Sequence, residues 1–171
     1  MLDAYLRPVI DRPLNHLGQR LSDVGLSPNA MTCIGFSLGI LAMTLIGYQH
    51  YMLASFAILG NRLADGLDGA IARHTQLSDF GGFLDIVADF IIYSGIVFAF
   101  GISQSHYLWY ALILIFSFIG PISSFLAYAI IASKRNISTQ ARGQKSFYYL
   151  GGLCEGTETA CVLLLMCWAP H

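Results

Sequence analysis

Five apolar stretches of the sequence each have about the length needed to cross a lipid bilayer. They cover residues 29–49, 51–72, 80–101, 107–132 and 146–168. A helix needs about 20 residues to cross ~30 Å of hydrocarbon. Backbone polar groups in lipid must be satisfied within the protein, which favours helices. We therefore expect an all-α integral membrane protein, a helical bundle of about five transmembrane helices.

The composition supports a surface that faces lipid. Only 11% of the 171 residues are charged, whereas about 25% is usual in a soluble domain. The formal net charge is −1, so the chain lacks the basic excess that is typical of nucleic-acid binding. We therefore expect membrane lipids as partners and no nucleic acid.

The N-terminal 24 residues have a different pattern, with leucines at helical spacing and charges between them. Pro8 and Pro13 would break or kink one long helix, so we expect one or two short amphipathic helices on the membrane surface. We divide the chain into this surface segment, residues 1–24, and a transmembrane domain, residues 25–171, that carries the chemistry. Ser27 and Pro28 indicate the start of its first helix.

The basic residues indicate the orientation in the membrane. The connections near 49–51 and 101–106 contain neither Lys nor Arg, and eight of the nine basic residues fall on the other side. The ninth, Arg62, lies within a span. Because positive charge favours the cytoplasmic side, we place the N-terminus and both basic connections there. The expected location is a bacterial-type inner or plasma membrane.

Four aspartates lie within the second and third spans, where ionisable groups are costly and usually functional. Asp65 and Asp68 are three residues apart and share a helix face, as do Asp85 and Asp89, four apart. The short connection over residues 73–79 makes the two helices antiparallel neighbours. The two carboxylate pairs should therefore face each other near the cytoplasmic side.

Converging carboxylates repel one another at low dielectric unless cations balance them. Oxygen ligands suit a hard divalent cation such as Mg²⁺, which often lies between carboxylates and substrate phosphates. Arg73 adds a planar fork for a phosphate oxygen. Gly66 and Gly69 carry no side chain, so a ligand or another backbone could approach closely.

The run from Asp65 to Arg73, followed by Gly81, Asp85 and Asp89, resembles the signature of the CDP-alcohol phosphotransferase (CDP-alcohol phosphatidyltransferase) family. That signature is D-x2-D-G-x2-A-R, then a short spacer and G-x3-D-x3-D, and all eight fixed identities are present. The spacer has seven residues where eight is more usual. Family members usually have six spans, whereas we count five.

The resemblance implies a metal-dependent transferase of phospholipid biosynthesis. It would transfer a phosphatidyl group from a CDP-linked donor, which we take to be CDP-diacylglycerol, to an alcohol acceptor and release CMP. It also implies Mg²⁺ or Mn²⁺, with two ions, an active site facing the cytoplasm, and a homodimer. Asp65, Asp68 and Asp85 would hold metal, and Asp89 would be the general base and a further metal ligand.

The resemblance further implies a set of substrate-binding residues. Gly69 would pack near the cytidine, Arg73 would hold phosphate and Ser78 would contact the nucleotide diphosphate. Asn29 and Thr32 lie in a stretch that would line the nucleotide site. Phe90 follows Asp89, where many lipid-synthesising members have Lys, which argues against the phosphatidylglycerophosphate-type subgroup.

Several polar residues have two interpretations. Arg142 and Lys145 belong to a basic cluster that could attract anionic lipid headgroups or bind a phosphate of either substrate. Glu155 and Glu158 could neutralise Arg62 or line the acceptor pocket. Arg62 could instead steady the aspartates, and in either case we expect a carboxylate partner. We expect Asp79 to cap the third span.

Other functions remain open at this stage. A small CDP-alcohol donor with a lipid acceptor would use the same signature. A membrane cation transporter also needs carboxylates within spans, although it has no need of Arg73 or of the Asp-Gly pairs. An inactive family member acting as a structural partner is a third alternative.

Overall fold

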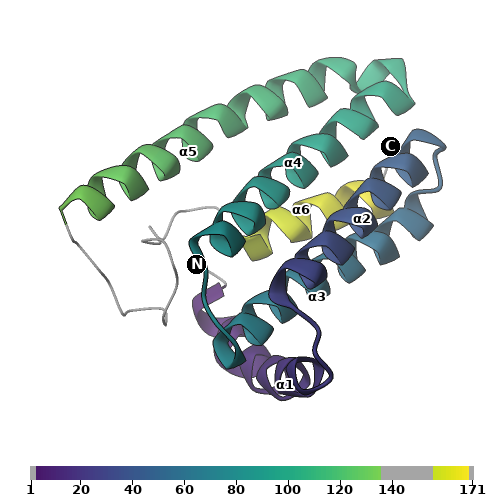
Figure 1. Ribbon diagram of the computed structural model, residues 1–171. Coiled ribbons are helices and arrows are strands. Elements are labelled where there is room, and N and C mark those ends of the chain that lie inside the picture. Colours follow the sequence, from purple (N-terminus) through teal and green to yellow (C-terminus); the bar gives the residue numbers. More distant parts are fainter. Residues whose placement is uncertain (1–2, 136–155, 170–171) are drawn as a thin grey trace.

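The computed structural model describes residues 3–135 and 156–169, and this part of the chain contains helices and no strand. Figure 1 shows the helices as an elongated bundle. The elements are α1 (Asp3–Asp23), α2 (Pro28–Gly47), α3 (Tyr51–His74), α4 (Asp79–Ser103), a short 3₁₀ turn η1 (Ser105–Tyr107), α5 (Leu108–Lys134) and α6 (Gly156–Trp168). The all-α prediction is confirmed.

Within the described residues, three helical segments are long and apolar enough to cross a membrane: α2, α4, and η1 with α5. They coincide with three of the five predicted spans. α3 has 24 residues, a length of ~36 Å at ~1.5 Å per residue, but it carries the charges of the signature. Of the fifth predicted span, only the 13-residue α6 is described. Large exposed side chains on α5, such as Trp109 and Phe116 at 73% and 75% exposure, suit contact with lipid.

Small residues bring α2 close to α3 and α4. A Cβ added at Gly35 would lie 3.1 Å from the Cβ of Ala64 on α3. At Gly39 it would lie 2.3 Å from the side chain of Ile92 on α4. In a membrane, such close approach replaces the hydrophobic effect as the source of helix association. The buried contacts of these three helices hold the aspartate-bearing faces of α3 and α4 together.

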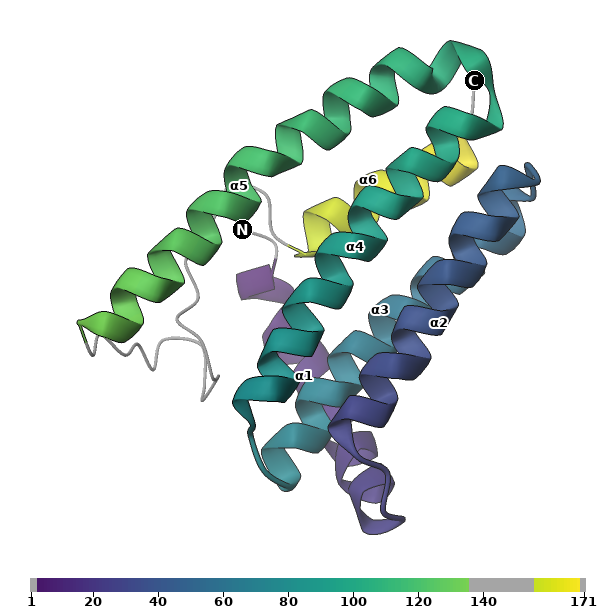
Figure 2. The same cartoon turned by 45° about the horizontal axis from the view of Figure 1, so that its top comes forward.

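The N-terminal segment forms one helix of 21 residues. We predicted that Pro8 and Pro13 would break or kink a long helix, and of these two outcomes the break is wrong. Each proline removes one backbone donor, and the packing of α1 against α3 offsets that loss. A Cβ at Gly18 would lie 2.6 Å from the Cβ of Ala70, and a Cβ at Gly66 would lie 2.9 Å from the side chain of Leu14. Figure 2 shows α1 beside the signature end of α3.

Two helix starts test the capping predictions. The hydroxyl of Ser27 accepts a hydrogen bond from the backbone N–H of Ala30 at 3.2 Å, and Pro28 follows as the first helical residue, as predicted. At α4 the cap is Ser78, whose hydroxyl accepts from the N–H of Gly81 at 3.0 Å. Asp79 is instead the first residue of α4, where a carboxylate still favours the helix dipole. The prediction of Asp79 as the cap was therefore wrong by one residue.

The two connections without Lys or Arg meet at one end of the bundle. The side-chain amide of Gln49 donates to the carbonyl of Ser103 at 3.1 Å, and that of Gln104 donates to the hydroxyl of Tyr51 at 3.0 Å. The connection between α3 and α4 lies at the opposite end in both views (Figures 1 and 2). This arrangement agrees with the relative sidedness of the connections that the basic residues predicted.

Candidate active site

Three of the four signature aspartates converge between α3 and α4. Asp65 and Asp68 on α3 and Asp85 on α4 each offer a carboxylate oxygen, and these oxygens all lie within 4.8 Å of one another. Helical spacing puts the first two on one face, and the antiparallel neighbour brings the third. We call these three residues the acidic group. The pairs from the two helices thus face each other, as the sequence predicted.

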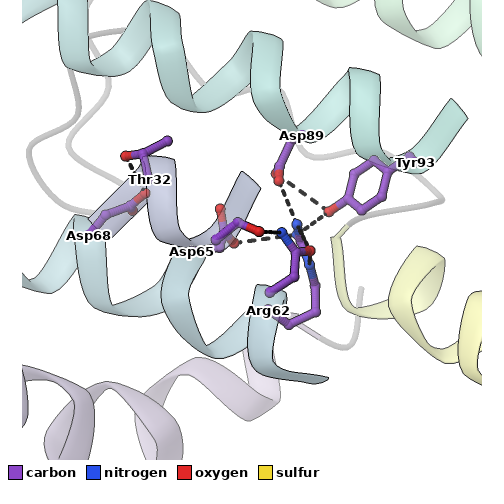
Figure 3. Close-up of polar contacts among 8 residues, drawn as sticks. Thr32, Arg62, Asp65, Asp68, Asp89 and Tyr93 are labelled. Carbon is purple, nitrogen blue, oxygen red and sulfur yellow. Dashed lines mark hydrogen bonds and ion pairs between the residues drawn. The ribbon is translucent and has the colours of Figure 1, made fainter. Parts of the chain in front are cut away.

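A threonine from α2 fixes one member of the acidic group. The hydroxyl of Thr32 donates to Asp68 Oδ2 at 2.7 Å (Figure 3), and it also lies 3.1 Å from the carbonyl of Pro28. Asp68 is only 5% exposed. A hydrogen bond to a buried carboxylate restricts its rotation and orients its second oxygen. The family resemblance assigned Thr32 to the nucleotide site, and that assignment stays a prediction beside the observed contact with Asp68.

A small cavity with a volume of about 10 Å³ lies beside the acidic group. That volume is close to the ~10–15 Å³ that a single water requires. Its lining comes from α2, α3 and α4: Thr32, Gly35, Phe36, Asn61, Asp65, Asp68, Asp85, Ala88 and Asp89. Three hard oxygen donors beside a space of this size are suited to a divalent cation.

The fourth signature aspartate, Asp89, belongs to a different set of contacts. Its Oδ1 accepts from Arg62 Nη2 at 2.6 Å, and its Oδ2 accepts from the hydroxyl of Tyr93 at 3.4 Å. Arg62 lies 3.5 Å from Asp65 Oδ2, so it links the two sets (Figure 3). The expectation that Arg62 pairs with a carboxylate is confirmed. Glu155, one of the partners considered for Arg62, lies outside the described residues.

Sequence reasoning missed Tyr93 and Asn61. Tyr93 is four residues after Asp89, on the same face of α4, and that spacing could have indicated a contact. Asn61 is a buried amide beside Arg62, whose Nε and Nη2 both donate to its Oδ1, at 2.9 and 2.7 Å. The sequence could have indicated this contact, because Asn61 is a polar residue next to a charged one within an apolar span.

The predicted phosphate and nucleotide residues lie towards the α3–α4 connection. Arg73 donates from Nε and Nη2 to Asn15 Oδ1 of α1, at 3.0 and 2.8 Å. A Cβ on Gly69 would lie 3.6 Å from Arg73 Nη1. Asn29 of α2 lies against Gly81, because a Cβ there would lie 3.1 Å from Asn29 Oδ1.

Two predicted substrate contacts, Arg142 and Lys145, lie outside the described residues. Ser78 lies at the start of α4, where its hydroxyl already caps the helix. These three assignments stay predictions.

An all-α membrane bundle with an acidic group between two antiparallel helices defines a class of integral membrane proteins with a candidate divalent-cation site. The CDP-alcohol phosphatidyltransferase family model matches residues 26–169, and the chain belongs to that family. The match begins after α1, so the N-terminal helix lies outside the segment that the family model covers. Family membership makes the protein a membrane transferase of phospholipid biosynthesis.

Individual relatives extend this finding. The inner membrane protein YnjF of Escherichia coli is 46% identical over 99% of this chain and 83% of its own length. The archaetidylinositol phosphate synthase of Pyrococcus horikoshii is 38% identical, over 56% of this chain and 51% of that protein. A CDP-diacylglycerol–serine O-phosphatidyltransferase of Helicobacter pylori is 30% identical over 83% of this chain and 56% of that protein. Together with the family match, the second and third of these relatives support CDP-alcohol phosphatidyl transfer as the class of reaction.

Proposed function

We propose that this protein transfers a phosphatidyl group from CDP-diacylglycerol to a hydroxyl of a small alcohol and releases CMP. The observation that carries the proposal is the convergence of Asp65, Asp68 and Asp85 within 4.8 Å, at the positions that the family signature prescribes. The name of the Helicobacter pylori relative states the same donor, and that likeness supports it here.

Asp65, Asp68 and Asp85 would hold Mg²⁺ or Mn²⁺. A bound divalent cation in such a site neutralises the donor diphosphate and stabilises the charge that develops on the leaving group. The role of the three residues is to supply negative charge and oxygen ligands, and the role of Thr32 is to keep Asp68 oriented. Whether one or two ions bind is part of the proposal to be tested.

The chemical step needs a proton acceptor, and we assign that role to Asp89. The acceptor hydroxyl gives its proton to Asp89 and its oxygen forms a bond to the phosphorus of the phosphatidyl group. The anhydride bond between that phosphorus and the oxygen of CMP breaks, and CMP leaves with the electron pair. A carboxylate base typically contributes a factor of about 10²–10⁴.

Arg73, Gly69, Asn29 and Ser78 would bind the nucleotide end of the donor near the α3–α4 connection. The guanidinium of Arg73 suits a phosphate because its fork matches two oxygens. Arg142 and Lys145 would bind a further phosphate. The site would face the cytoplasm, because the sequence pattern assigns the basic connections to that side, and the family resemblance suggests a homodimer.

The test is to incubate the purified protein in detergent with Mg²⁺, CDP-diacylglycerol and, separately, serine, glycerol phosphate and inositol phosphate, and to measure CMP. We expect CMP release that depends on one acceptor and stops with EDTA. A parallel reaction with CDP-choline and diacylglycerol tests the reverse arrangement of donor and acceptor.

A matched pair of variants supplies the control. Asp85→Asn should lose CMP release, whereas Asp79→Asn, an exposed position of the same helix, should retain it. Divalent-cation flux through vesicles without CMP release from any donor would contradict the proposal and favour a transporter. Equal activity of the two variants would contradict the assignment of the acidic group.

A further inference from the structure

The N-terminal helix α1 lies beside the signature end of α3 (Figure 2), although the family match begins only after it. Its packing uses one face of α3. A Cβ on Gly66 would lie 2.9 Å from the side chain of Leu14, and a Cβ on Gly18 would lie 2.6 Å from the Cβ of Ala70. The signature fixes neither Gly66 nor Ala70. This chain therefore has small residues at two open positions of the motif, and α1 packs closely against them.

The same face of α3 carries Arg73, because positions 66, 70 and 73 follow the i, i+4, i+7 spacing of one helix face. Asn15 of α1 is its partner. Asn15 Oδ1 accepts hydrogen bonds from Arg73 Nε at 3.0 Å and from Arg73 Nη2 at 2.8 Å. The position of α1 therefore determines where one edge of the guanidinium lies.

The other edge of the guanidinium lies over the glycine that is predicted to pack near the cytidine. A Cβ on Gly69 would lie 3.6 Å from Arg73 Nη1, and Nη1 donates to no protein group among the described residues. A guanidinium has five N–H donors, and Asn15 takes up one from each of two nitrogens. The end formed by Nη1 and the second hydrogen of Nη2 can still bind two phosphate oxygens.

A guanidinium that is held before the donor arrives binds phosphate at a lower entropic cost. Arg73 is exposed and has a long flexible stem, so a free side chain would lose rotamer freedom when phosphate binds. The two bonds to Asn15 restrict the side chain in the protein without substrate. Donor binding then meets a group that is already oriented.

The partner of Arg73 is uncharged, unlike the partners of the other arginine of α3. Arg62 contacts the carboxylates of Asp89 and Asp65 at 2.6 and 3.5 Å, so its charge is balanced within the protein. Asn15 accepts hydrogen bonds from Arg73 through an amide oxygen, which carries no charge. The bonds to Asn15 therefore orient Arg73 without neutralising its charge, and that charge can attract an anionic ligand.

We propose that Asn15 is a positioning residue of the donor site. It holds one edge of Arg73 through an uncharged oxygen and so presents the other edge, with its positive charge, to the diphosphate of the donor. The inference rests on the proposed function for the identity of that donor. It makes α1 a part of the substrate site, although α1 lies outside the segment that the family model covers.

The experiment measures the Kd of CDP-diacylglycerol by calorimetry, for the full-length protein in detergent with Mg²⁺, and so requires no acceptor. Asn15→Ala removes the bonds to Arg73, and we expect the Kd to rise about fivefold. Asn15→Asp keeps an oxygen acceptor but adds a negative charge that balances Arg73. We expect its Kd to rise about twentyfold, more than that of the alanine variant.

A role of Asn15 confined to docking α1 predicts the opposite order, because a carboxylate would strengthen the bond to Arg73. On that alternative Asn15→Asp binds the donor as the wild type does, and only Asn15→Ala is weakened. The control is Gln19→Glu, which adds the same charge at an exposed position one turn along α1. Its Kd should stay within about twofold of the wild type, because solvent and salt screen a distant surface charge.

Gly18→Ala displaces Asn15 without changing either partner of the hydrogen bonds. The added methyl would lie 2.6 Å from the Cβ and 2.9 Å from the backbone carbon of Ala70, so α1 must move away from α3. We expect the Kd to rise about fivefold, with no further rise when Asn15→Ala is added, because both changes act through Arg73. Gly47→Ala is the control, since a Cβ there meets nothing within 4 Å.

Two results would overturn the inference. One is a wild-type Kd for a folded Asn15→Ala protein, and the other is donor binding by Asn15→Asp that equals that of Gln19→Glu. If Asn15→Ala does not fold, the comparison of Asn15→Asp with Gln19→Glu decides. Donor binding without CMP release from any acceptor would contradict the proposed function but not this inference, whereas absence of donor binding by the wild-type protein would refute both.

Discussion

The polar site between α3 and α4 has two ends, and the carboxylates at these two ends have different partners. At one end, Asp65, Asp68 and Asp85 gather around a small cavity with a hydroxyl from Thr32. At the other end, about one helical turn away, Asp89 meets a positive charge that the protein itself supplies. The difference shows that a signature aspartate takes its role from its neighbours as well as from its place in the motif.

The largest effect should come from breaking the acidic end. Replacing Asp65 and Asp68 together with Asn removes two of three charged ligands. We expect CMP release to fall by at least about 1,000-fold, with loss of Mn²⁺ binding measured in the same preparation. The control is the double variant Asp23→Asn and Asp79→Asn, which removes two exposed charges. Retained Mn²⁺ affinity in the first double variant would contradict the assignment.

Asp89→Asn tests the other end and should give the next largest effect. We expect turnover to fall about 1,000-fold, because the amide cannot accept the proton, while donor binding is retained. Binding of CDP-diacylglycerol can be measured by calorimetry in detergent and turnover by CMP release. Near-normal turnover would show that another group acts as the base.

Thr32→Val sharpens the comparison by removing one hydroxyl while nearly keeping the shape. The variant loses the hydrogen bond to Asp68 and so no longer orients that carboxylate. We therefore expect the Mg²⁺ concentration for half-maximal CMP release to rise about tenfold. Thr44→Val is the matched control on the same helix, since the hydroxyl of Thr44 bonds only its own helix, at the carbonyl of Ile40. Equal Mg²⁺ requirements of the two variants would refute an orienting role for Thr32.

The smallest effect concerns α1. Asn15→Ala removes the acceptor that holds Arg73, and the KM for the donor should rise about fivefold, equivalent to roughly 1 kcal/mol for a lost hydrogen bond. Gln19→Ala, an exposed amide of the same helix, is the control. An unchanged KM together with an unchanged kcat would show that Arg73 needs no help from α1.

The sequence predicted the fold where one physical requirement dominated. The length of apolar runs located α2, α4 and α5, and the Ser27–Pro28 pair located the start of α2 within one residue. Prediction failed where packing outweighed local preference. Pro8 and Pro13 do not divide α1, which packs against α3. These contacts join distant parts of the sequence, so the local pattern of the N-terminal residues could not predict them.

The candidate site could be predicted as far as helical periodicity reaches. Spacing and antiparallel pairing brought Asp65, Asp68 and Asp85 together. Periodicity could not tell that Asp89 would turn to Arg62, nor that Thr32 would bond Asp68. Both contacts join different helices and depend on how the helices are rotated about their axes.

The ties between Gln49 and Ser103, and between Tyr51 and Gln104, have a mechanical consequence. They join the helix ends at one side of the bundle, and the short connection over residues 75–78 joins α3 to α4 at the other side. Asp89 lies 14 residues before Ser103, ~21 Å along α4 at ~1.5 Å per residue. The two aspartate-bearing helices are therefore tied at both ends, and the acidic group lies near the covalent tie, where α3 and α4 can separate least.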